Sequence, residues 1–231
     1  TEGRRTTNLI SSTQQFFIIP ASLSTWLTVK QYLLSGAEHL LTGWDHVLFV
    51  IGLFVLLFQR RRIMILAITA FTLGHSLTLL SASMGFIPFN PQVVEIFIAI
   101  TLIVLAMEIL NLNKPSHPWA IRHHPFILTF VFGLIHGFGF ASVLSDALTQ
   151  EGQLWVPLLS FNIGIEIGQL LILSICLTIT SPYILLKKDL LKEVILNTWV
   201  KEGLNTHHTQ TVIGYVLGIM SSYWLISRIV G

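Results

Sequence analysis

Six stretches of about 20 apolar residues dominate this chain and restrict what it can fold into: residues 39–58, 63–83, 92–111, 126–145, 155–180 and 211–229. A helix of ~20 residues crosses a hydrocarbon core of about 30 Å, and in lipid only helices or closed barrels satisfy their backbone polar groups. Charged residues make up only 10% of the chain and hydrophobic residues 53%. The sequence therefore predicts an all-α, polytopic membrane helix bundle with about six transmembrane helices.

The amino-terminal region differs from the rest. Residues 1–15 are polar, and the apolar residues that follow are interrupted by Pro20 and Lys30, so this segment is too broken to span a membrane. We interpret residues 1–35 as an external polar stub followed by an interfacial amphipathic helix, and residues 36–231 as a six-span transmembrane domain. Because the chain begins with Thr1, we expect that a preceding piece has been removed or truncated.

The basic residues predict an orientation. Nine of the thirteen Lys and Arg residues fall in the first, third and fifth loops between the predicted spans, beginning with Arg60, Arg61 and Arg62. The positive-inside rule places these loops in the cytoplasm, which puts both termini on the external or periplasmic side. We therefore expect an integral protein of a bacterial inner (plasma) membrane.

Ionisable residues inside the spans are the main functional signal. No Lys or Arg lies in the interior of a span, yet five acids and four histidines lie in or at the edges of the spans: Glu38, Asp45, Glu95, Glu108, Glu166, His39, His46, His75 and His136. A carboxylate in hydrocarbon costs a few kcal/mol, about 2.5 or more on the lenient scale, unless a proton, hydrogen bonds or a bound ion compensates it. Histidine with carboxylate is a ligand set for divalent transition metals. Together these residues favour a metal or proton pathway over simple hydrogen bonding between helices.

The strongest local motif is Gly36-Ala-Glu38-His39-Leu-Leu-Thr-Gly43-Trp-Asp45-His46. On one continuous helix, His39 and His46 are two turns apart and share a face, with Asp45 one position away. This geometry predicts two metal ligands and a carboxylate at the external start of the first span.

Other spans place polar residues at a similar depth. His75 and His136 lie in glycine-containing segments of the second and fourth spans, and Glu166 lies in the fifth. Asn162, Glu166 and Gln169 form one stripe with i, i+4, i+7 spacing, in which the two amides would act as secondary ligands or as contacts between helices. Glu38 is a further secondary candidate. Glu95 fits either a carboxylate at a helix amino terminus or a ligand at the mouth of a metal path, while Glu108 with His117, His123 and His124 would mark an inner exit.

These residues resemble the HupE/UreJ family of hydrogenase and urease accessory membrane proteins. The resemblance rests on His39-x5-Asp45-His46, on the histidine-glycine segments around His75 and His136, and on the stretch from Phe161 to Gln169. It covers most of residues 36–230. The resemblance implies a secondary permease for nickel, in some members cobalt, with His39, Asp45 and His46 as metal ligands. It also implies that His136 and a glutamate, here Glu166, complete the ligand set.

Two functions remain open at this point. The leading hypothesis is binding and secondary transport of Ni²⁺, or of Co²⁺ or Zn²⁺, which the same ligands also suit. The alternative is an intramembrane zinc-dependent hydrolase, a peptidase or lipid hydrolase, with Asp45 or Glu166 as general base. The expected partners are the lipid bilayer and the metal ion, with a metallochaperone or a membrane-anchored substrate as a further one. No basic stripe indicates nucleic acid.

Overall fold

The computed structural model describes residues 25–86, 90–112, 120–151, 155–188 and 206–230, and all regular structure in these ranges is α-helical. The prediction of an all-α membrane helix bundle is confirmed. The elements are α1 (Thr25–Thr42), α2 (Trp44–Leu57), α3 (Arg61–Ser83), α4 (Pro91–Leu110), α5 (Pro125–Glu151), α6 (Trp155–Lys188) and α8 (Thr206–Val230).

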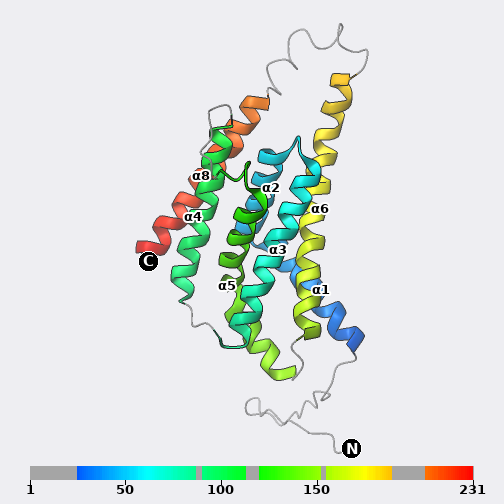
Figure 1. The fold of residues 1–231 in the computed structure, drawn as a ribbon, viewed down its shortest axis with the longest axis vertical. Helices are drawn as coiled ribbons and strands as arrows, with labels where there is room; N and C mark the ends of the chain where they lie inside the picture. The colour runs from blue at the N-terminus through cyan, green and yellow to red at the C-terminus, as the bar shows by residue number, and fades with distance from the viewer. Residues whose placement is uncertain (1–24, 87–89, 113–119, 152–154, 189–205, 231) are drawn as a thin grey trace, which may run out of the picture.

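The helices form three closely packed pairs around α2. These pairs are α3 with α5, α1 with α6, and α4 with α8, and α2 makes contacts with α1, α3, α4, α6 and α8. Figure 1 shows α2 near the middle of the bundle, with the α4/α8 pair on one flank and α1 and α6 on the other. The central helix is accordingly apolar, and its Phe49, Val50 and Leu53 are fully buried.

Glycines allow two of these pairs to approach closely. A Cβ on Gly36 of α1 would collide with the backbone carbonyl of Phe161 on α6. A Cβ on Gly133 of α5 would likewise collide with the carbonyl of Phe71 on α3. Small residues at such contacts let helix backbones meet without intervening side chains, the usual packing device where lipid supplies no hydrophobic drive. The pairs α1/α6 and α3/α5 therefore hold their histidines in fixed relative positions.

The first predicted span, 39–58, is not one straight helix. The chain breaks at Gly43, which has φ −77° and ψ 98°, and α1 and α2 meet there at 73°. A Cβ at Gly43 would lie only 2.9 Å from the His39 carbonyl oxygen and 3.0 Å from His46 Nδ1. The bend thus depends on glycine, and it makes α1 and α2 a broken span or a re-entrant segment.

The other predicted spans correspond to helices, whose ends differ least for α3 and α4 and most for α6, which continues to Lys188 instead of ending at residue 180. Within the described part of the chain, α3, α4, α6 and α8 are long and apolar enough to cross a membrane, and the bent α1/α2 pair counts as a fifth span. The apolar part of α5, Pro125–Gly139, is shorter than a full span. The domain division at residue 35 stays a prediction, although residue 35 lies inside α1, and residues 1–24 lie outside the described ranges.

Candidate metal centre

Four histidines and one aspartate meet where the α1/α2 bend faces α3 and α5. They form two groups of residues whose ligand atoms lie within 4.8 Å of one another: His39, His46 and His75 in one group, and Asp45, His46 and His136 in the other. His46 belongs to both groups. Below, these five residues are called the histidine centre.

The rings of the histidine centre are close to one another. The His46 ring centroid lies 4.9 Å from that of His39, 5.2 Å from that of His136 and 5.9 Å from that of His75. His39 and His46 come together across the bend. On a straight helix, seven residues would separate them by about 10.5 Å along the axis. The prediction of a shared helix face is therefore wrong, and the break at Gly43 is what joins the two residues.

Asp45 fixes the orientation of His46. Its Oδ1 lies 3.0 Å from His46 Nδ1. A carboxylate accepts hydrogen bonds, so the ring donates Nδ1–H and keeps the lone pair on Nε2. His46 Nε2 is buried and has no hydrogen-bond partner among the described residues. Metal-binding imidazoles in proteins are commonly oriented in this way: a carboxylate accepts a hydrogen bond from one ring nitrogen and leaves the other nitrogen available for the metal.

Thr101 of α4 does the same for His136. Its hydroxyl lies 2.7 Å from the Ile98 carbonyl oxygen and 3.0 Å from His136 Nε2. The hydroxyl has one proton and the carbonyl only accepts, so both contacts are satisfied when His136 donates Nε2–H to Thr101. This leaves the lone pair on Nδ1, which is buried and has no partner in the described residues. Asp45 Oδ2 lies 4.0 Å from that same Nδ1.

The unsatisfied nitrogens make this a site for a ligand. His75 is completely buried and interacts with the Asn162 side chain, but neither of its ring nitrogens makes a hydrogen bond of standard geometry with a described residue. Buried polar atoms in proteins are nearly always paired, because an unpaired one costs about 1–3 kcal/mol. With His46 and His136, this places several unpaired imidazole nitrogens around one small volume. A transition-metal ion is the ligand whose chemistry matches them.

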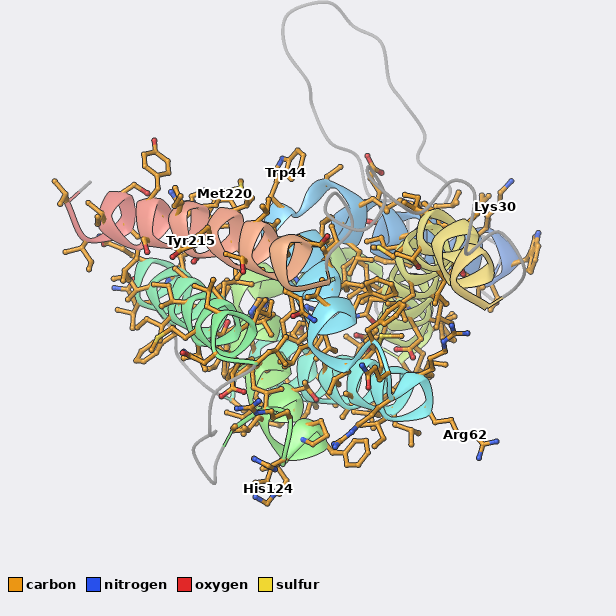
Figure 2. All side chains as sticks on the ribbon, turned by 90° about the horizontal axis from the view of Figure 1, so that it is seen from above. Lys30, Trp44, Arg62, His124, Tyr215 and Met220 are labelled. Carbon is orange, nitrogen blue, oxygen red and sulfur yellow. The ribbon has the colours of Figure 1, made fainter. Side chains whose placement is uncertain are left out.

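A pocket of about 340 Å³ leads to the histidine centre. Its walls include His39, Asp45, His46 and His136 from the centre, Trp44 at the bend, and Glu95, Trp224 and Arg228 farther out. Figure 2 shows Trp44 at the edge of the bundle beside α8, and its side chain is 66% exposed. Glu95 and Arg228 lie near the ends of α4 and α8 that are opposite Arg61 of α3 (Figure 1). The pocket therefore opens away from Arg60, Arg61 and Arg62, which we call the arginine cluster.

Glu166 lies in neither of the two groups. Thr69 donates a hydrogen bond of 2.7 Å to Glu166 Oε1, and Thr72 lies 2.6 Å from Glu166 Oε2. Thr72 also lies 2.9 Å from Gln169 Oε1. The third residue of the predicted stripe, Asn162, is buried and donates to the Leu158 carbonyl oxygen. The structure thus brings Glu166 and Gln169 together at the α3/α6 contact, beside the histidine centre.

The remaining acids are at helix ends. Glu38 is exposed and lies outside both groups. Glu95 forms an ion pair with Arg228, and Glu108 Oε2 lies 3.9 Å from Arg122 Nε. The expectation that no basic side chain compensates the acids of the spans is therefore wrong for these two. Arg122 and Arg228 lie beyond or at the end of their spans, so only the fold shows which carboxylate each one reaches.

Three threonines with a part in these contacts were not predicted from the sequence. Thr72 lies three residues before His75, and Thr69 three residues before Thr72, so each neighbouring pair has the i, i+3 spacing of adjacent positions on the surface of α3. That pattern was available as a signal. Thr101 gives no comparable signal, because it is one hydroxyl in an apolar helix and its partner is on another helix.

Comparison with known proteins identifies a family. The sequence model of the HupE / UreJ protein family matches residues 13–228, nearly the whole chain. No curated protein and no solved structure matches it. The family match includes every residue of the histidine centre and all the described helices up to Arg228. The chain belongs to the HupE/UreJ family of integral membrane proteins.

Proposed function

We propose that this protein binds a divalent transition-metal ion at the histidine centre and transports it across the membrane. The observation that carries the proposal is the convergence of His39, His46, His75 and His136 around one small volume, in which His46, His75 and His136 have buried ring nitrogens without a hydrogen-bond partner among the described residues. A structural subunit has no use for such atoms, which are costly to bury. Membership in the HupE/UreJ family supports the same conclusion.

The two overlapping groups suggest two successive positions for the ion. All three residues of the group Asp45, His46 and His136 line the pocket, whereas the other group has His39 and His46 in the pocket wall and His75 beyond it. An ion arriving through the pocket would meet Asp45, His46 and His136 first. It would then move to His39, His46 and His75, with His46 as the shared ligand. Sharing one ligand lets an ion move without ever losing all its bonds to protein, which keeps the barrier low.

The donor atoms set the range of ions. Imidazole and carboxylate bind Ni²⁺, Co²⁺ and Zn²⁺, and the family favours nickel or cobalt among them. We propose Ni²⁺ as the main substrate. The positive-inside rule and the loop charges support an inner-membrane protein whose pocket opens to the periplasm, with both termini on that side. A metallochaperone receiving the ion at the cytoplasmic face fits this direction.

Uptake of radioactive nickel into proteoliposomes tests the proposal. Wild-type protein should give saturable uptake that His46→Ala abolishes, because this variant removes a ligand from both groups. Thr178→Val is the control, since Thr178 lies on an exposed part of α6 and its hydroxyl bonds only to the Ser174 carbonyl. Absence of saturable uptake by the wild type, or equal uptake by the His46 variant, would refute transport through this centre.

The size of the pocket favours one second candidate, a zinc-dependent intramembrane hydrolase. At about 340 Å³ it falls within the range of small-molecule sites, roughly 300–1,000 Å³, and is larger than an ion needs. Of the two proposed bases, Asp45 lines the pocket and Glu166 does not. Asp45→Asn should then retain zinc and lose turnover of a membrane-anchored peptide or lipid. Unchanged turnover would exclude Asp45 as the base.

A further inference from the structure

We propose that Glu166, Thr69, Thr72 and Gln169 form a second, oxygen-lined cation site, which receives the metal ion as it leaves the histidine centre. We call these four residues the oxygen site. The transit role rests on the proposed transport function, whereas the existence of the site rests on the contacts of these residues alone.

The oxygen site has more acceptors than protons. The single hydroxyl proton of Thr72 is shared among three oxygens: Glu166 Oε2 at 2.6 Å, Gln169 Oε1 at 2.9 Å and the Ile68 carbonyl at 3.3 Å. Only one of them can receive that proton at a time. Such a concentration of lone pairs is favourable for a cation, and no Lys or Arg among the described residues pairs with Glu166.

Burial makes this imbalance costly. Gln169 is completely buried, Thr72 is 7% exposed, and Gln169 Nε2 has no hydrogen-bond partner within the described ranges. Turning the Gln169 amide around would pair its nitrogen with Thr72 but would leave its oxygen without a donor. In either orientation one amide atom stays unsatisfied, and in the turned orientation that atom is an oxygen, which a bound cation would satisfy.

The position of the oxygen site fits a step after the histidine centre. Thr72 precedes His75 on α3 by three residues, a rise of about 4.5 Å, and Thr69 lies one further turn away. Because α3 begins at Arg61, both threonines lie on the arginine-cluster side of His75, farther from the pocket mouth (Figure 1). On α6, Glu166 and Gln169 follow Asn162 in the same direction. A continuous polar stripe thus runs from His75 to Thr69.

The donor atoms change from nitrogen at the histidine centre to oxygen at the oxygen site, and this change indicates the direction in which the ion would leave. Imidazole nitrogen holds Ni²⁺ and Co²⁺ tightly, while carboxylate, hydroxyl and amide oxygens suit harder ions such as Mn²⁺ and bind late transition metals less strongly. An ion that has reached the oxygen site is therefore easier to release. Beyond Thr69, α3 offers the buried apolar side chains Ile68, Ala67 and Met64. These side chains offer the ion no further ligand on α3.

Two experiments test the inference separately from the proposed function. The first detects the site without transport: Mn²⁺, an oxygen-seeking probe, is titrated into detergent-solubilised His46→Ala protein and free Mn²⁺ is followed by electron paramagnetic resonance. We expect one Mn²⁺ site, weakened at least about tenfold by adding Glu166→Gln. Thr178→Val is the control, because its hydroxyl bonds only to the Ser174 carbonyl on an exposed part of α6. No bound Mn²⁺, or binding indifferent to Glu166→Gln, overturns the oxygen site.

The second experiment measures nickel uptake by Glu166→Gln and Thr72→Val in the wild-type background. Uptake should fall at least about tenfold, while nickel affinity at the histidine centre stays within about threefold, which also shows that the variants are folded. Wild-type rates in both variants overturn the transit role. Loss of uptake without any Mn²⁺ site in the first experiment also overturns it, since Glu166 would then carry protons. A wild type without uptake refutes transport itself, and the Mn²⁺ titration still decides whether the site exists.

Discussion

Replacing Thr101 with valine should weaken metal binding without touching a metal ligand. Thr101 is 3% exposed and its hydroxyl accepts the His136 Nε2–H bond. Valine has nearly the same shape, so the change removes one hydrogen bond and creates almost no cavity. The Nε2–H of the buried His136 then has no acceptor, and the imidazole loses the contact that fixes its tautomer.

The magnitude follows from the difference between the empty and the loaded protein. A buried donor without a partner costs about 1–3 kcal/mol in either state. Binding of a cation at Nδ1 makes the Nε2–H a stronger donor, so the loss is larger in the loaded state. Loss of such supporting bonds typically lowers metal affinity by about 10–100-fold, or roughly 1.4–2.7 kcal/mol. We expect Thr101→Val to fall in that range.

Competition with a chromophoric chelator, in detergent and at fixed pH, measures this affinity for Ni²⁺. Thr129→Val is the matched control, because Thr129 is fully buried on the same helix as His136 but bonds only to backbone carbonyls of its own first turns. The control should keep wild-type affinity. The reasoning is refuted if Thr101→Val changes affinity less than about threefold, or if Thr129→Val loses as much.

Three further predictions concern stability and access. Nickel at 100 times its dissociation constant should raise the unfolding free energy by about 2.7 kcal/mol, measured by denaturation in detergent, and a chelator or His46→Ala should remove this gain; equal stabilisation of the variant would place the ion elsewhere. Gly133→Ala should destabilise by about 1–3 kcal/mol and weaken metal binding because its Cβ meets the Phe71 carbonyl, whereas Gly218→Ala, whose Cβ has room, should be neutral or stabilising in thermal unfolding; similar effects of both would contradict tight α3/α5 packing. Glu95→Gln should leave nickel affinity within about threefold of wild type, because Glu95 is engaged by Arg228 on an exposed surface where ion pairs contribute about 0–1 kcal/mol; a larger loss in the chelator assay would make Glu95 a ligand.

Hydropathy predicted most of the fold, because a membrane requires long apolar helices whatever their packing. The span predicted at 63–83 became α3, and that at 92–111 became α4, with ends differing by a residue or two. The bend at Gly43 was missed. The residues on both sides of it are apolar enough to continue one helix, and a glycine such as Gly43 does not by itself mark a break, because glycine is common inside membrane helices.

The sequence also identified the histidines of the site, but not how they meet. His75 and His136 were predicted from their depth and from the family resemblance, and the structure places both beside His46. Glu166 was predicted to bind the same ion because it lies at roughly the same depth in the membrane. Its actual partners are Thr69 and Thr72. Which residues it contacts depends on how α6 is rotated about its axis relative to α3, and the depth of a residue in the membrane does not predict that rotation.

X-ray absorption spectroscopy of the nickel-loaded protein is the most direct test of the histidine centre. We expect nitrogen and oxygen atoms as the nearest neighbours of the nickel ion, together with the outer-shell scattering of at least three imidazole rings. The imidazole scattering should be weaker in His46→Ala. A spectrum with one imidazole or none, or one unchanged by the His46 substitution, would show that the ion is held elsewhere and would contradict the central claim.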